Sequence, residues 1–132
     1  MKLLKTTTLA ILLSTAAFAA PKADMATDMR TMLAAMQQIE SAGFYSDVDG
    51  MKEGLGKLKG GLKTLLSRDA KEYLPDDKAY ANKFAQKSAK MIEMYADDMI
   101  DSLNRNNMDD ALENYTLMLK QCNSCHLRMR SY

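Results

Sequence analysis

Two cysteines separated by two residues, with a histidine directly after the second, lie near the end of the chain at Cys122, Cys125 and His126. They are the only two cysteines and the only histidine among the 132 residues. This order is typical of a c-type haem attachment site, because two thiols bond to the two haem vinyl groups and the adjacent imidazole reaches the iron. The motif therefore predicts one covalent haem c, held by Cys122 and Cys125, with His126 as the proximal iron ligand.

Other uses of a Cys-x-x-Cys pair fit this sequence less well. A thioredoxin-like dithiol belongs to a strand–helix context, which the sequence lacks. A structural zinc site needs four ligands, and the chain offers two thiols and one imidazole. A haem-free exported protein with a dithiol or a plain disulfide stays open as an alternative.

The first 19 residues have the pattern of a secretory signal peptide. A basic start at 1–5 precedes a small, apolar run at 6–17, and Ala17-Phe18-Ala19 forms an A-x-A cleavage signal. We expect cleavage after Ala19 and a periplasmic protein of residues 20–132, with an uncleaved anchor as the alternative. The apolar run is too short to span a membrane, and no other run is long enough.

The composition of the mature chain favours a single all-helical domain. Leucine, methionine and alanine dominate and β-branched residues are few. Loss of Lys2 and Lys5 leaves 16 of the 18 basic residues against 17 acidic ones, a net charge of about −1. No basic field predicts nucleic-acid binding. No serine nucleophile motif, phosphate loop or second histidine is present, so we do not expect an enzyme.

Apolar residues recur three and four apart in four segments, which predicts four amphipathic helices. The first is expected to run from about Asp24 to Ser41, and Gly43 is the residue expected to end it. The second starts after a capping Asp47, and a connection at 68–75 follows it. The third runs to about Asn104, and Asn106 or Asn107 caps the fourth.

The spacing also predicts which residues are buried. The expected inward positions are Met25, Met29, Met32, Met36 and Ile39 in the first helix; Val48, Met51, Leu55, Leu58, Leu62 and Leu65 in the second; Phe84, Ser88, Met91, Tyr95, Met99 and Leu103 in the third; and Met108, Leu112, Tyr115, Leu119, Cys122, His126 and Met129 in the fourth.

Two further groups of residues have a specific interpretation. Gly50, Gly54 and Gly61 lie near one face of the second helix, where a neighbouring backbone or a cofactor can approach closely; tolerance of glycine in a packed bundle is the alternative. The acidic patch of Asp97, Asp98 and Asp101 serves either solubility or the docking of a basic partner.

The position of the cysteine–histidine motif limits the second axial ligand. Only six residues follow His126, so a sixth iron ligand must come from upstream, and no other histidine exists. A methionine, another weak donor or an open iron position remain as choices.

Four amphipathic helices with Cys-x-x-Cys-His on the last one, close to its end, resemble the cytochrome c′ family over the whole mature chain. The resemblance implies an antiparallel four-helix bundle with the haem on the C-terminal helix. It places Arg130 near the proximal haem face, whereas Met129 stands where the family has an aromatic residue. By analogy alone, it also allows a homodimer through the first two helices.

The family contains two functional branches. One supplies a methionine from the first helix to the iron and transfers electrons, and the other leaves the iron five-coordinate and binds nitric oxide or carbon monoxide. The resemblance implies Met29 as the distal residue, with Met25 or Met32 as alternatives. We therefore expect an electron-transfer cytochrome with unidentified redox partner proteins, and a gas-binding haem protein as the second hypothesis.

Overall fold

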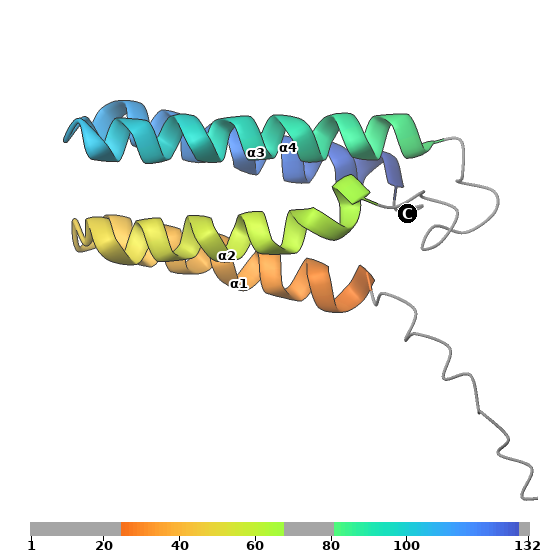
Figure 1. Ribbon diagram of the computed structural model, residues 1–132, viewed down its shortest axis with the longest axis horizontal. Helices are drawn as coiled ribbons and strands as arrows, with labels where there is room; N and C mark the ends of the chain where they lie inside the picture. The colour runs from red at the N-terminus through yellow and green to blue at the C-terminus, as the bar shows by residue number, and fades with distance from the viewer. Residues whose placement is uncertain (1–24, 68–80, 130–132) are drawn as a thin grey trace, which may run out of the picture.

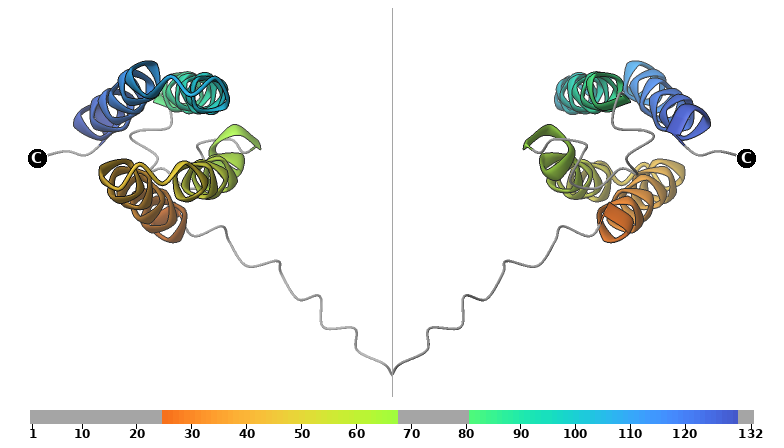
Figure 2. Two further views of the ribbon diagram at one scale, coloured as in Figure 1. Left: turned by 90° about the vertical axis from the view of Figure 1, so that its left-hand side faces the viewer. Right: turned by 90° about the vertical axis from the view of Figure 1, so that its right-hand side faces the viewer.

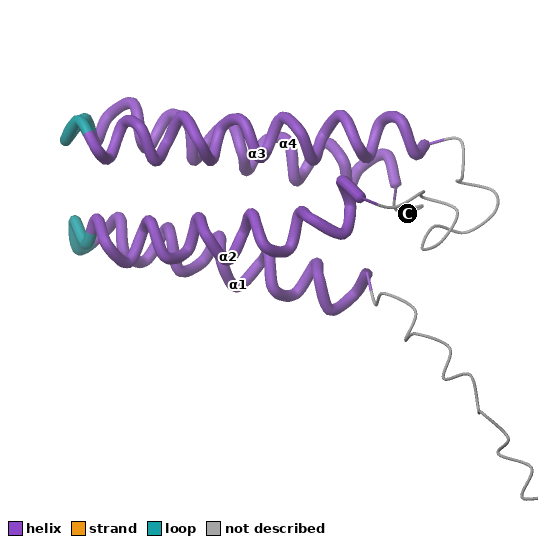
Figure 3. Tube along the Cα trace, in the orientation of Figure 1, coloured by secondary structure: helices purple, strands orange, loops and turns teal. Residues whose placement is uncertain are grey.

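The computed structural model describes residues 25–67 and 81–129, which form four α-helices (Figures 1 and 3). They are α1 (Met25–Phe44), α2 (Val48–Ser67), α3 (Asn82–Asn104) and α4 (Met108–Met129). These ranges contain no strand, and none of their helices has the length and apolar character of a membrane span. The predicted signal peptide, the connection at 68–75 and Arg130 lie outside the described residues.

The four helices run antiparallel along one common direction (Figures 1 and 2). Helix α1 packs closely on α2 and α3 packs closely on α4, while α2 and α3 join the two pairs through a smaller contact. The backbones of α1 and α4 hardly approach each other. The predicted all-helical class and the four-helix arrangement are confirmed, and haem attachment stays a prediction.

The turn between α1 and α2 and the turn between α3 and α4 end the preceding helices in the same way. Ser46 has a φ of 54° and Asn106 a φ of 56°, the left-handed conformation that closes many helices. In each turn the next residue donates its backbone N–H to the carbonyl five residues back, at 2.9 Å. The predicted end of the first helix at Gly43 is slightly wrong, because the left-handed residue comes three positions later and the helix continues to Phe44.

A side-chain cap starts the helix after each of these turns. Asp47 Oδ1 accepts a hydrogen bond from the backbone N–H of Gly50 at 2.9 Å. Asn107 Oδ1 accepts one from the backbone N–H of Asp110 at 3.2 Å. Each bond satisfies a donor that the first helical turn leaves unpaired. The predicted caps at Asp47 and Asn107 are confirmed.

The predicted stripes of α1 and α2 meet in the core. From α2, Met51, Leu55, Leu58 and Leu62 are fully buried and Leu65 nearly so. From α1, the buried members of the predicted set are Met32, Met36 and Ile39, and the partly buried members are Met25 and Met29.

The predicted stripes of α3 and α4 are partly wrong. In α3 the core face is made mainly by small residues, whereas Phe84, Met91 and Tyr95 are partly exposed. The buried residues of α3 are Ala85, Ser88, Ala89, Ile92, Ala96, Met99, Ser102 and Leu103. Small side chains let α3 approach its neighbours closely, so apolar size alone is a poor guide to the buried face.

In α4 the fully buried positions are Ala111 and Met118, each next to a predicted one. The predicted Leu112 and Leu119 are 46% and 41% exposed. Leu119 belongs to the wall of a cavity instead. The helix is thus turned so that its cysteines and His126 are part-buried rather than part of the closed core.

Two of the glycines of α2 explain the close packing against α1. A Cβ atom at Gly54 would lie 2.7 Å from Ile39 Cγ1 and 3.2 Å from the Ala35 carbonyl oxygen. A Cβ atom at Gly61 would lie 2.6 Å from Met32 Cγ. These distances are shorter than a packed interior tolerates, so both glycines permit the approach of α1.

We expect Gly54→Ala to lower the free energy of unfolding by about 1–3 kcal/mol, because Ile39 and the α1 backbone would have to move. Gly60 is the matched control on the same helix, since nothing lies within 4 Å of a Cβ atom there. Gly60→Ala should raise the free energy of unfolding by about 1 kcal/mol through helix propensity. Urea denaturation of both variants measures the difference, and equal effects would contradict the packing role of Gly54.

Candidate functional site

Two adjoining cavities lie in the half of the bundle that holds the start of α1 and the end of α4. The inner cavity, of about 170 Å³, reaches Met36, Leu62 and Ile92. The outer cavity, of about 690 Å³, reaches Met25 and Met129. Six residues line both, so the two form one continuous site: Met29, Leu33, Leu65, Ala85, Cys125 and His126.

All three residues of the cysteine–histidine motif border this site. Cys122 lines the inner cavity, and Cys125 and His126 line both cavities. The helical spacing explains this, because residues three and four apart in α4 lie on one side of the helix. The structure thus brings together the predicted haem-binding side chains of α4.

The predicted methionines face the motif from α1. Met29 lines both cavities together with His126. Met25 lines only the outer cavity and Met32 only the inner one. Met29 therefore occupies the central position among the three candidates for a distal residue.

The walls of the site are largely apolar, as a cofactor pocket requires. Leu33 of α1 and Ala85 of α3, which the sequence did not indicate, complete the wall together with Leu65 of α2, which was expected as a core residue. Leu33 lies one turn after Met29, so the period of α1 is the signal that reveals it.

Arg30 adds a cation to the outer cavity. Its Nη2 donates a hydrogen bond to the Thr27 hydroxyl at 2.9 Å. A guanidinium group at this place complements an anionic group on a ligand that enters the cavity.

Burial changes the acidity of both thiols. It raises the pKa of Cys122 to about 11, with a smaller contribution from the neighbouring Cys125. Burial also raises the pKa of Cys125, and a hydrogen bond from the Ser88 hydroxyl of α3 opposes that increase. Both groups are therefore neutral thiols near pH 7 in the haem-free chain.

Arg128 points toward α3 rather than into the site. Its guanidinium carbon lies 4.5 Å from the centre of the Phe84 ring, a cation–π contact between α4 and α3. Phe84 was predicted as a core residue, but it is partly exposed and its ring contacts Arg128.

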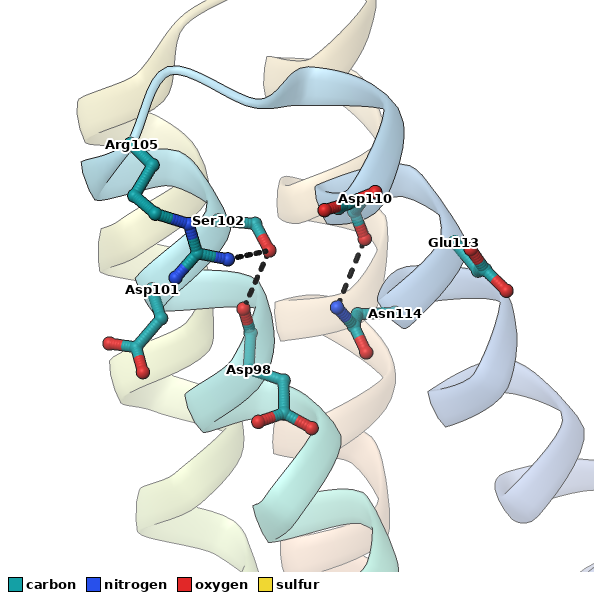
Figure 4. A pocket seen from close by; sticks show the side chains of 7 residues that line it. All are labelled: Asp98, Asp101, Ser102, Arg105, Asp110, Glu113 and Asn114. Carbon is teal, nitrogen blue, oxygen red and sulfur yellow. Dashed lines mark hydrogen bonds between the residues drawn. The ribbon is translucent and has the colours of Figure 1, made fainter.

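A separate acidic pocket of about 270 Å³ lies beside the turn between α3 and α4 (Figure 4). Asp98 and Asp101 come from α3, and Asp110 and Glu113 come from α4. The α4 residues that line this pocket, from Asp110 to Asn114, lie about 12–18 Å from Cys122 along the helix, so the pocket is separate from the cavities. The third member of the predicted acidic patch, Asp97, pairs with Lys59 of α2. In the described residues, no three His, Cys, Asp or Glu side chains gather as a metal-binding group.

Comparison with protein-family models, curated proteins and solved structures finds no match to this chain.

Proposed function

We propose that this chain is an exported monohaem c-type cytochrome that transfers electrons through a haem ligated by His126 and Met29. One observation carries the proposal: His126 of α4 and Met29 of α1 line the same pair of apolar cavities, and both cysteines line the inner one. A c-type haem needs this combination of two thiols, an adjacent imidazole and an apolar enclosure.

The side chains of the site fit the chemical groups of a haem. Cys122 and Cys125 would form the two thioether bonds, and His126 would hold the iron from the proximal side. Met29 would supply a sulfur ligand from the distal side, and Arg30 offers a cation to a haem carboxylate. When bound, the haem supplies reversible one-electron chemistry at its iron.

The residues around the site favour electron transfer over other haem chemistry. A thioether ligand raises the reduction potential and limits the rearrangement at the iron on reduction. Apolar walls from α1, α2 and α3 would exclude water from a bound haem, which would also raise its reduction potential. The electrons would pass to redox partner proteins in the periplasm.

A visible spectrum with and without carbon monoxide tests the proposal. The exported protein is expected to be low-spin, to show the weak far-red band of a methionine–iron bond when oxidised, and to remain unchanged by carbon monoxide. A colourless protein with two unmodified cysteines would overturn the assignment.

A five-coordinate, gas-binding haem is the second candidate, and Leu33 is the observation that favours it. Leu33 lines both cavities beside Met29. If this apolar side chain rather than Met29 covered the distal side, the iron would keep an open position for nitric oxide or carbon monoxide. A high-spin spectrum that changes on adding either gas would establish this function instead.

The raised pKa values argue against a haem-free dithiol function. Thiol–disulfide exchange needs the thiolate, and reactive dithiols have lowered pKa values. Here burial raises the pKa of both Cys122 and Cys125. With fewer thiolates near pH 7, rapid thiol–disulfide exchange is disfavoured.

We therefore expect slow alkylation of Cys122 in the folded, haem-free chain. A pKa of about 11 against 9.0 for an unperturbed thiol leaves about 100-fold less thiolate near pH 8. The rate with iodoacetamide should rise as the pH approaches 11. The urea-unfolded chain is the control and should react at the ordinary rate. Fast reaction of the folded chain near neutral pH would instead support a dithiol function.

A further inference from the structure

The charged residues of the described helices are divided between the two ends of the bundle. The cavity half holds every wall residue of the two cavities except Met36, and it consists of 25–34 of α1, 58–67 of α2, 82–92 of α3 and 119–129 of α4. It carries eight basic residues and one acidic residue, Asp28. The turn half, 35–57 and 93–118, includes the two short turns at the other end (Figure 3) and carries eleven acidic residues and three basic ones. The small net charge of the mature chain therefore hides a basic end and an acidic end.

Most basic side chains of the cavity half are in contact with solvent. Seven of the eight are exposed, and the eighth, Lys59, pairs with Asp97 at the border between the two halves. Five of the exposed ones belong to the closely packed helices α3 and α4. These five form what we call the basic surface: Lys83, Lys87, Lys90, Lys120 and Arg128.

The lysines of α3 lie behind a cavity wall. Lys83, Lys87 and Lys90 recur four and three apart, so they share one face of the helix. The buried Ala85 and Ile92 lie on the opposite face and line the inner cavity. One helix thus carries the cavity wall on one side and the basic surface on the other.

The basic surface continues on α4 at the cysteine–histidine motif. Lys120 precedes the motif and Arg128 follows it, and the cation–π contact of Arg128 with Phe84 joins α4 to α3 at this place. Leu127 is 63% exposed beside Arg128 and adds an apolar side chain to the surface. Charged residues around an apolar contact are typical of a protein interface.

Helix stability does not explain the lysines at the start of α3. The positive end of the helix dipole favours acidic residues in a first turn, and α1, α2 and α4 each have at least one there. The first turn of α3 has none and contains Lys83 instead. This placement costs about 0.3–1 kcal/mol of helix stability. A role in binding accounts for a basic residue at such a position.

We propose that the basic surface is the docking site for a redox partner protein that carries an acidic surface. The inference rests on the proposed function, and it adds the chemical class of the partner and the face that the partner meets. A helix with its side chains is about 10 Å wide, so a partner docked on α3 and α4 lies about one helix diameter from the cavities. An electron would cross that distance between the haem and the partner.

The division of charge favours a protein over an extended polyanion. An acidic protein is attracted by the basic surface and repelled by the turn half, so the electrostatic field both accelerates and orients its approach. A nucleic acid or an anionic membrane extends past the basic surface and also meets the carboxylates of the turn half.

Oxidation of the reduced haem protein by two small complexes measures the sign of the charge around the site. One electron passes from the ferrous haem to anionic hexacyanoferrate(III) or to cationic tris(phenanthroline)cobalt(III). Between about 10 mM and about 200 mM salt, the rate with hexacyanoferrate(III) should fall about tenfold, and the rate with the cobalt complex should not fall. A protein that responded only to its slightly negative net charge would show the opposite order.

Two variants that change the net charge equally separate the basic surface from the rest of the protein. Lys87→Glu alters the basic surface, and Lys52→Glu alters the turn half. Poly-L-glutamate is the probe for an acidic protein surface, and the anisotropy of the labelled polymer reports its binding. At low salt, Lys87→Glu should weaken this binding and slow the reaction with hexacyanoferrate(III) about fivefold, and Lys52→Glu should change either by less than about twofold.

Equal effects of the two variants would overturn the docking site, because only the net charge would then matter. Tighter binding to phosphatidylglycerol vesicles than to poly-L-glutamate, lost in Lys87→Glu, would overturn it in favour of a membrane. Failure of the proposed function is seen separately, because the exported protein would then contain no haem to oxidise, whatever its binding to poly-L-glutamate.

Discussion

Replacing both Cys122 and Cys125 by serine in the exported protein is expected to abolish covalent haem attachment completely. The chain holds no other cysteine, so no other side chain can form the thioether bonds. After acid denaturation, the double variant should have the mass of the polypeptide alone, whereas the native protein should keep the added mass of one haem. Intact-mass spectrometry measures the difference directly.

The same double variant should still bind haem non-covalently, because His126 and Met29 remain at the cavities. Its haem should pass to a competing haem-binding protein, and its melting temperature should fall as haem is withdrawn. Ser124→Ala is the matched control, since residue 124 lies between the cysteines and forms neither bond. Haem that survives acid denaturation in the double variant would contradict the assignment of the two cysteines.

The local structure of the helix ends could be predicted from the sequence because the signals are local. Asp47 and Asn107 each cap a helix through a contact three residues away, and such a contact depends on almost nothing else in the fold. The buried stripe of α2 was predictable for a similar reason, since apolar residues recur three and four apart along the whole helix.

The rotation of α3 and α4 could not be predicted in the same way. Spacing arguments favour large apolar side chains, but the core face of α3 carries Ala85, Ala89 and Ala96. Whether an alanine faces the core depends on how closely two helices approach, and that distance is a property of the whole bundle. Leu119 was predicted to be buried but lines the inner cavity. The spacing pattern could not separate the two places, because a cavity wall and a closed core both require apolar residues.

The candidate site was predictable in its chemistry but not in its shape. The motif named Cys122, Cys125 and His126, and the resemblance to the cytochrome c′ family named Met29, with Met25 or Met32 as alternatives. That α1 and α4 stay apart and leave a cavity between these residues is a consequence of tertiary packing. Ser88 was expected as a core residue, and the structure shows that it also lines the inner cavity.

Replacing Met29 by alanine in the haem-loaded protein is expected to convert a low-spin iron into a high-spin iron that binds carbon monoxide. The covalent haem should remain, because Cys122, Cys125 and His126 are unchanged. Loss of the thioether ligand should lower the reduction potential by on the order of 0.1 V. Visible spectroscopy with and without carbon monoxide, together with a redox titration, measures both effects.

Met25 and Met32 provide matched controls from the same face of the same helix. Each lines only one of the two cavities that Met29 and His126 share, so neither Met25→Ala nor Met32→Ala should change the spin state. If Met32→Ala rather than Met29→Ala opened the iron to carbon monoxide, Met32 would be the ligand. If the native protein already bound carbon monoxide and none of the three variants altered its spin state, the iron would have no methionine ligand. The apolar cover from Leu33 would then define the site, and gas binding would replace electron transfer as its function.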